Sequence, residues 1–167
     1  KLFHTNTFSD IKAIEQKIVK NQLPNGGFSW FDGGKENFDI STRMLEVMGK
    51  ALKLDPTLVN SNLRAVAEKL ANYLDTDTTI NSPFVASYIA LDYLYARHYW
   101  NGLYPLSKEK ANKLQSILQK SSLTTAKQSA GVAAKSRITN QLFGTGATSN
   151  EIKNRIIQEA VNDTLRG

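Results

Sequence analysis

The chain has 167 residues, of which 41% are hydrophobic and 22% are charged, and it carries a formal net charge of +6. These proportions are ordinary for a folded globular domain and exclude wholesale disorder. The lack of cysteine excludes disulfides, zinc–thiolate sites and a thiol nucleophile within this sequence, and no apolar run reaches the roughly 18 residues of a membrane span. Because the sequence starts at Lys1 rather than at methionine, we expect it to be a piece of a longer protein.

Apolar residues recur at helical spacing along the chain, and no segment alternates as a strand would. A glycine- and aromatic-rich loop over Asn21–Asp39 interrupts the pattern after the first helix. Three start signals are clear: Asp55-Pro56 and Ser82-Pro83, each a capping residue followed by proline, and the capping box Thr148–Glu151. Ser107 can cap a further helix. The expected helices cover residues 8–20, 40–53, 55–74, 83–100, 107–121, 124–142 and 149–165.

The helices fall into hairpins at 40–75, 83–121 and 124–165, which start about 41–44 residues apart, the length of a two-helix repeat. The helix at 83–100 is apolar almost all round, so we expect it inside the assembly with Tyr88, Leu91 and Tyr95 inaccessible. These patterns predict an all-α fold of about seven helices, with antiparallel hairpins forming part of an α/α toroid or an open solenoid. Residues 1–167 are then one helical domain or part of a larger one.

Positive charge is concentrated between Arg97 and Arg137, where eight basic residues accompany a single acidic one, Glu109. No aromatic residue lies between Tyr104 and Phe143 to stack on bases, so we expect no nucleic-acid binding. A solvated helical face is the favoured interpretation, and the less favoured alternatives are nucleic acid or an acidic partner surface.

Candidate chemical groups are few, and structural interpretations are favoured for all of them. His4 and His98 are far apart and lack metal-ligand spacing, so no metal site is expected, and His98 is interpreted as a helix-end residue packed among aromatics. Asp75 and Asp77 form a carboxylate pair that can serve as a proton donor, but a turn after a helix is favoured.

Asp92 and Arg97 are polar residues within the apolar helix 83–100, and both are candidate buried polar groups. Burial without a partner would raise the pKa of a carboxyl such as Asp92, so a structural partner is favoured over catalysis. No catalytic residue and no cofactor is expected, and the chain is predicted not to be an enzyme.

The most informative run is Gln22–Gly34, with two double glycines and three aromatics close together. It resembles a Gln-x-x-x-Gly-Gly-Phe-x-Trp-aromatic-x-Gly-Gly signature in the helical thioester domain of bacterial alpha-2-macroglobulin-like proteins. Residues 83–97 also resemble an inner helix of that domain. The signature residues, which we interpret as structural, are Gln22, Gly26, Gly27, Phe28, Trp30, Phe31, Gly33 and Gly34.

The resemblance implies an α/α toroid in a large extracytoplasmic protease trap of the periplasm or cell envelope. The partners would be the rest of the parent chain and, through it, target proteases. Since this sequence has no cysteine, the thioester motif is either upstream of Lys1 or absent from this member. The expected function is that of a non-catalytic helical segment of a protease-inhibitor protein.

Two alternatives stay open. An enzyme on the same scaffold, either cyclase-like or glycan-processing, is suggested by the Gln-x-x-x-Gly-x-Phe run and by Asp75-Thr-Asp77, although Thr78 stands where a cyclase motif needs aspartate. A helical-repeat interaction module is the other alternative.

The orientation of the loop aromatics Phe28, Trp30 and Phe31 decides whether they have a structural role or form a binding surface. Exposed, they would form a platform for a sugar or a peptide. We expect instead that all three fold inward and close one end of the helical array, with the glycines fitting where the backbone crosses helix ends.

Overall fold

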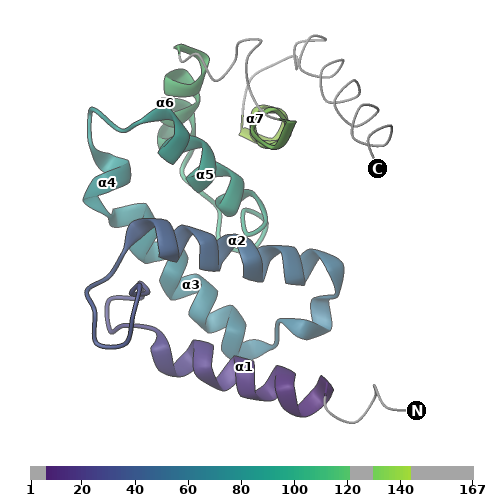
Figure 1. Ribbon diagram of the computed structural model, residues 1–167. Coiled ribbons are helices and arrows are strands. Elements are labelled where there is room, and N and C mark those ends of the chain that lie inside the picture. The colour runs from purple at the N-terminus through teal and green to yellow at the C-terminus, as the bar shows by residue number, and fades with distance from the viewer. Residues whose placement is uncertain (1–6, 121–129, 144–167) are drawn as a thin grey trace, which may run out of the picture. The chain divides into compact units, whose positions relative to one another are not determined.

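The computed structural model describes residues 7–120 and 130–143, and within these residues the predicted all-α fold is confirmed (Figure 1). The described segments contain no strand, and the expected helix at 149–165 lies outside them. The chain divides into two compact units, Lys1–Thr79 and Ile80–Gly167. The helices are α1 (Thr7–Asn21), α2 (Phe38–Leu54), the 3-10 turn η1 (Pro56–Leu58), α3 (Ser61–Thr76), α4 (Thr78–Asn81), α5 (Ser87–His98), α6 (Lys108–Lys120) and α7 (Ala130–Phe143).

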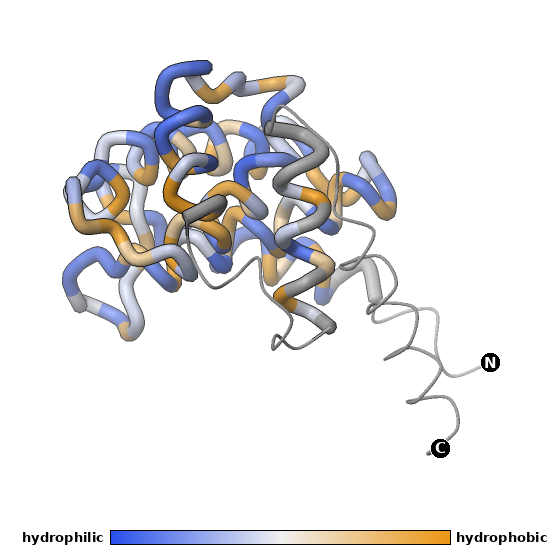
Figure 2. Tube along the Cα trace, turned by 90° about the horizontal axis from the view of Figure 1, so that it is seen from above, coloured by the Kyte–Doolittle hydropathy of each residue, from blue (hydrophilic) through white to orange (hydrophobic). Residues whose placement is uncertain are grey.

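In the first unit, α3 packs against both α1 and α2. Hydrophilic and hydrophobic residues are interspersed along the tube in Figure 2 rather than gathered in separate segments, as expected of amphipathic helices. The stripe of α3 meets the 3.6-residue expectation, because buried positions return every three to four residues along the helix: Leu63, Val66, Ala67, Leu70, Ala71, Tyr73 and Leu74.

The predicted cap at Asp55 is confirmed, but the α-helix does not begin there. The Asp55 carboxylate accepts hydrogen bonds from the N–H and hydroxyl of Thr57, which closes the 3-10 turn η1 and holds the pKa of Asp55 below its usual value. The α-helix starts one turn later, because the Asn60 side chain accepts from the N–H groups of Asn62 and Leu63. Two capping residues in succession thus divide one expected helix into a turn and a helix.

In the second unit, α5 packs against α6 and α7. The prediction that 83–100 is one buried helix is correct for its middle only: Leu91 and Tyr95 are buried, but Tyr88 is 61% exposed and the expected burial is wrong there. The helix does not begin at Pro83, because the Ser82 hydroxyl accepts from the Phe84 N–H and forms a separate turn. The expected cap at Ser107 is confirmed by its acceptance of the Lys110 N–H.

The favoured interpretation of Asp75 and Asp77 as a helix end is confirmed. Helix α3 ends at Thr76, and the Asp77 carboxylate accepts from the Thr79 N–H at 2.7 Å. Burial raises the pKa of Tyr73 well above its usual value of about 10, and a hydrogen bond to Asp77 adds to this shift.

The raised pKa of Tyr73 predicts a pH dependence of stability. Below about pH 10 the phenol is neutral in both states, so its full contribution is present. Above that pH the unfolded chain ionises first, so the free energy of unfolding should fall by at most about 1.4 kcal/mol per pH unit on this account. Urea unfolding measures the free energy of unfolding at about pH 8 and at about pH 11. The fall between these two pH values should be smaller in Tyr73→Phe than in the wild type. Equal losses in both proteins would contradict this assignment.

Candidate functional site

Gln22 fixes the start of the long loop onto α3. Its side-chain amide donates to the carbonyl of Gly26 and to the carbonyl of Val66, both at 2.9 Å. The first bond closes the loop on itself, together with the backbone bond from the Gly26 N–H to the Leu23 carbonyl. The second joins the loop to a helix 44 residues away in the sequence. Gln22 is therefore an architectural residue.

The first double glycine lets the loop backbone cross α3 closely, as expected, although the crossing is at Lys69 within the helix rather than at its end. Gly26 has φ +92°, and a Cβ there would lie 2.5 Å from the carbonyl oxygen of Lys69. A Cβ on Gly27 would lie 3.0 Å from the Tyr73 ring. Gly33 has φ +76° but open space around it, so only its backbone conformation favours glycine.

Phe28 is the loop aromatic that folds inward, with 4% of its surface exposed. Its N–H donates to the Ser41 hydroxyl on α2 at 2.9 Å, and its carbonyl accepts from the Asn37 N–H at 2.8 Å. Asn37 in turn caps α2 by accepting from the Ile40 N–H. Phe28 thus joins the loop to the start of α2.

The expectation that all three aromatics fold inward is wrong for Trp30 and Phe31, which are 73% and 68% exposed. After Phe28 the chain turns outward: Ser29 pairs with Glu36 in an isolated bridge, and the Phe31 carbonyl accepts from the Ser29 hydroxyl and the Gly34 N–H. These bonds satisfy the loop internally, so neither aromatic is needed to close the core. We call residues 29–36 the aromatic arm.

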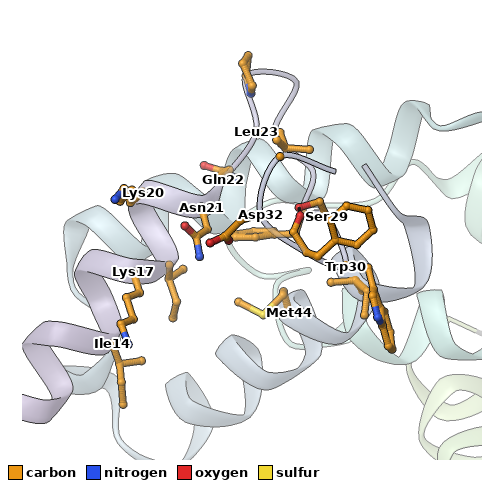
Figure 3. Close-up of a pocket in the computed structure, with 16 residues that line it drawn as sticks. Ile14, Lys17, Lys20, Asn21, Gln22, Leu23, Ser29, Trp30, Asp32 and Met44 are labelled. Carbon is orange, nitrogen blue, oxygen red and sulfur yellow. Dashed lines mark hydrogen bonds between the residues drawn. The ribbon is translucent and has the colours of Figure 1, made fainter. Parts of the chain in front are cut away.

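The aromatic arm forms one side of a groove of about 710 Å³ (Figure 3). The C-terminal half of α1 forms the opposite wall, and the first turns of α2 form the floor. The lining residues include Lys17, Ile18 and Lys20 from α1, Trp30 and Asp32 from the arm, and Ile40 and Met44 from α2. We call this the α1–α2 groove.

Sequence reasoning missed the α1–α2 groove. The signal was present as two apolar pairs at i, i+4 spacing, Ile14 with Ile18 and Ile40 with Met44, on either side of the loop. Each pair alone is typical of a buried helix stripe. Ile14 is nevertheless 57% exposed, so its helix presents apolar surface that the described residues do not cover.

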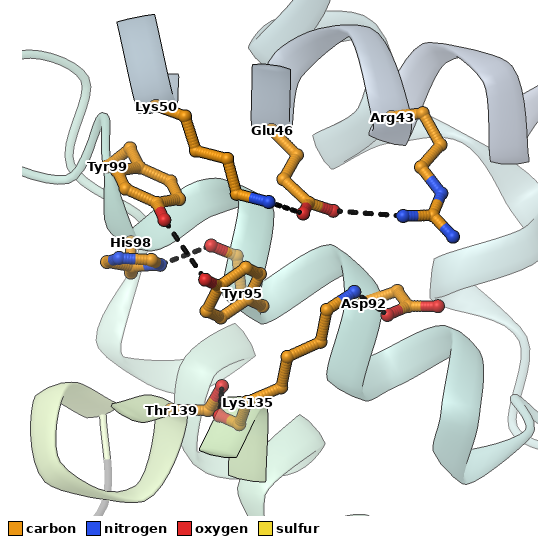
Figure 4. A network of polar contacts seen from close by, with 9 residues as sticks. All are labelled: Arg43, Glu46, Lys50, Asp92, Tyr95, His98, Tyr99, Lys135 and Thr139. Atoms are coloured by element: carbon orange, nitrogen blue, oxygen red, sulfur yellow. Dashed lines mark hydrogen bonds and ion pairs between the residues drawn. The ribbon is translucent and has the colours of Figure 1, made fainter. Parts of the chain in front are cut away.

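Asp92 has the structural partner expected of it (Figure 4), and Arg97 has the expected burial. The Asp92 side chain is 44% exposed and pairs with the Lys135 ammonium at 2.7 Å, so the expected burial of this carboxylate is wrong. Lys135 also lies 5.1 Å from the centre of the Tyr95 ring, a cation–π contact. Arg97 is fully buried, and its guanidinium donates to the Tyr104 carbonyl at 2.9 Å.

The buried Arg97 is an exception to the expected solvated basic face, while Lys108 and Lys113 are exposed. His98 ends α5 and packs against Tyr95 and Tyr99, as expected, with a ring nitrogen close to the Tyr95 carbonyl (Figure 4). Over residues 7–120 and 130–143 no three acidic or histidine side chains are grouped to hold a metal ion. His4 lies outside the described residues.

A further buried carboxylate, Glu46 on α2, was not singled out from the sequence. It pairs with Lys50 at 2.6 Å and with Arg43 at 3.7 Å, so its charge is compensated along one helix (Figure 4). Both partners lie on the turns next to Glu46 in the same helix, at the i,i+3 and i,i+4 spacings at which ion pairs stabilise helices.

No protein family, curated protein or solved structure matches this chain. None of the helices in the described part is long and apolar enough to cross a bilayer.

Proposed function

We propose that the chain is a non-catalytic helical segment of an alpha-2-macroglobulin-like, extracytoplasmic protease-trapping protein, in which its hairpins form part of an α/α toroid. The proposal rests on one observation: residues of the signature run Gln22–Gly34 hold the loop against the helices. Gln22 and Gly26 hold the loop against α3, and Phe28 ties it to α2. Such tasks suit a scaffold signature rather than a catalytic one.

In this proposal the segment contributes shape, while the rest of the parent chain surrounds the target protease. With no cysteine in the sequence, these 167 residues cannot form the Cys–Gln thioester themselves. Any covalent capture would then depend on another part of the parent protein.

The test is protease trapping by the parent protein. A trap encloses the protease and blocks large substrates, while small substrates still diffuse to its active site. We expect the parent protein to suppress digestion of a protein substrate such as casein and to leave hydrolysis of a short chromogenic peptide intact. Equal inhibition of both substrates, or of neither, would contradict the proposal.

The α1–α2 groove favours a second candidate, an interaction module. Its exposed Trp30 and Phe31 and its apolar floor are features of a binding surface. This candidate does not require an enclosing toroid, and binding at the groove is compatible with either assignment.

A further inference from the structure

We propose that the α1–α2 groove binds an acidic peptide segment of a partner protein, with apolar side chains on the groove floor and carboxylates along α1. This goes beyond the trapping function and does not depend on it.

The floor of the groove fits apolar side chains. Ile18, Ile40 and Met44 are aliphatic and half-buried, so each keeps surface available for contact. Methionine adapts its shape to different partners because its side chain is unbranched and flexible. Trp30 stands at the side of the groove with its ring exposed, and large rigid aromatics of this kind are the commonest energetic anchors of protein interfaces (Figure 3).

The polar groups of the groove favour a peptide over a sugar. A sugar presents many hydroxyls, and each needs a hydrogen-bond partner when it leaves water. Two of the groove's polar side chains are already engaged inside the protein: the Gln22 amide donates to two backbone carbonyls, and the Ser29 hydroxyl donates to the carbonyl of Phe31. An aliphatic floor adds no such partners, whereas it suits Leu, Ile or Phe side chains.

The charged residues around the groove indicate which charge the partner segment carries and how it is oriented. Lys17 and Lys20 are exposed on the α1 wall, and because they are three residues apart they lie on the same face of the helix. The charged lining residue of the arm is Asp32, whose side chain is drawn near Asn21 at the C-terminal end of α1 (Figure 3). A segment that carries carboxylates beside its apolar residues would place them at Lys17 and Lys20 and away from Asp32.

A displayed library of random 12-residue peptides tests the proposal without requiring that the partner be identified. The wild-type chain is the target, and peptides that also bind Trp30→Ala are removed. We expect enrichment of sequences with Asp or Glu beside large apolar residues. Enrichment of basic sequences, or no enrichment, would overturn the proposal.

The affinity of the most enriched peptide, made synthetically, then tests each part of the groove. We expect about tenfold or greater weakening in Trp30→Ala, and about two- to fivefold weakening in Lys17→Glu and in Lys20→Glu. Lys53→Glu is the matched control, since Lys53 is exposed on α2 but does not line the groove, and should bind like the wild type. Circular dichroism should show that all four variants fold.

Equal effects of the three lysine variants would mean that net charge, rather than the groove, attracts the peptide, and would overturn the proposal. Dimerisation of the wild-type chain that is lost in Trp30→Ala would assign the groove to a second copy and would also overturn it.

Discussion

Gly26→Ala is expected to lower the free energy of unfolding by about 2–6 kcal/mol, the sum of two costs. Forcing a side chain into the left-handed conformation at φ +92° costs about 1–3 kcal/mol. Overpacking adds about 1–3 kcal/mol, because the new Cβ would lie 2.5 Å from the Lys69 carbonyl oxygen, a backbone atom within α3. The loop or the helix must therefore move, and the bond from Gln22 to Val66 is weakened with it.

Gly33→Ala is the matched control, measured with Gly26→Ala by urea unfolding. Gly33 has a similar positive φ but open space around it, so only the conformational cost of about 1–3 kcal/mol applies. Equal decreases in the free energy of unfolding of the two variants would show that the close crossing of α3 does not make Gly26→Ala more costly. That result would contradict the role given to Gly26.

Trp100→Ala is expected to lower the free energy of unfolding by about 3–5 kcal/mol, the usual range for truncation of a buried large aromatic. Trp100 is fully buried and lies near-parallel to Tyr104, with ring centres 6.0 Å apart. Trp30→Ala should change stability by less than about 0.5 kcal/mol, because a largely exposed ring loses little contact on truncation. The two variants make the same chemical change in opposite environments.

Thermal and urea unfolding of both tryptophan variants measure this difference. A large loss in Trp30→Ala would mean that the arm packs inward after all, as the sequence pattern suggests. A small loss in Trp100→Ala would contradict the placement of that ring in the core.

Helix periodicity predicted most of this fold, and its errors have local causes. Asp55-Pro56 is a valid start signal, but the stronger two-bond cap at Asn60 governs where α3 begins. Tyr88 belongs to an apolar run, yet it lies in the first turn of α5, ahead of the buried stripe. The periodicity of apolar residues predicts that a helix has an apolar face, but it does not predict which element packs against that face.

The loop shows the same limit. Its first double glycine was correctly expected to allow a close crossing, because a positive φ and a missing Cβ are properties of the residue itself. The direction of Trp30 depended instead on how Ser29, Phe31 and Gly34 bond to one another. The groove combines residues of α1, the loop and α2, so no single segment of sequence could reveal it.

Iodide quenching of tryptophan fluorescence tests the central claim, that Trp30 lies exposed beside the α1–α2 groove. The chain has two tryptophans, one exposed and one fully buried, so iodide should quench part of the native emission and leave the rest. We predict that Trp30→Phe removes the quenchable part and leaves emission that iodide barely affects. Native emission that resists iodide, or quenching that persists in Trp30→Phe, would contradict the account.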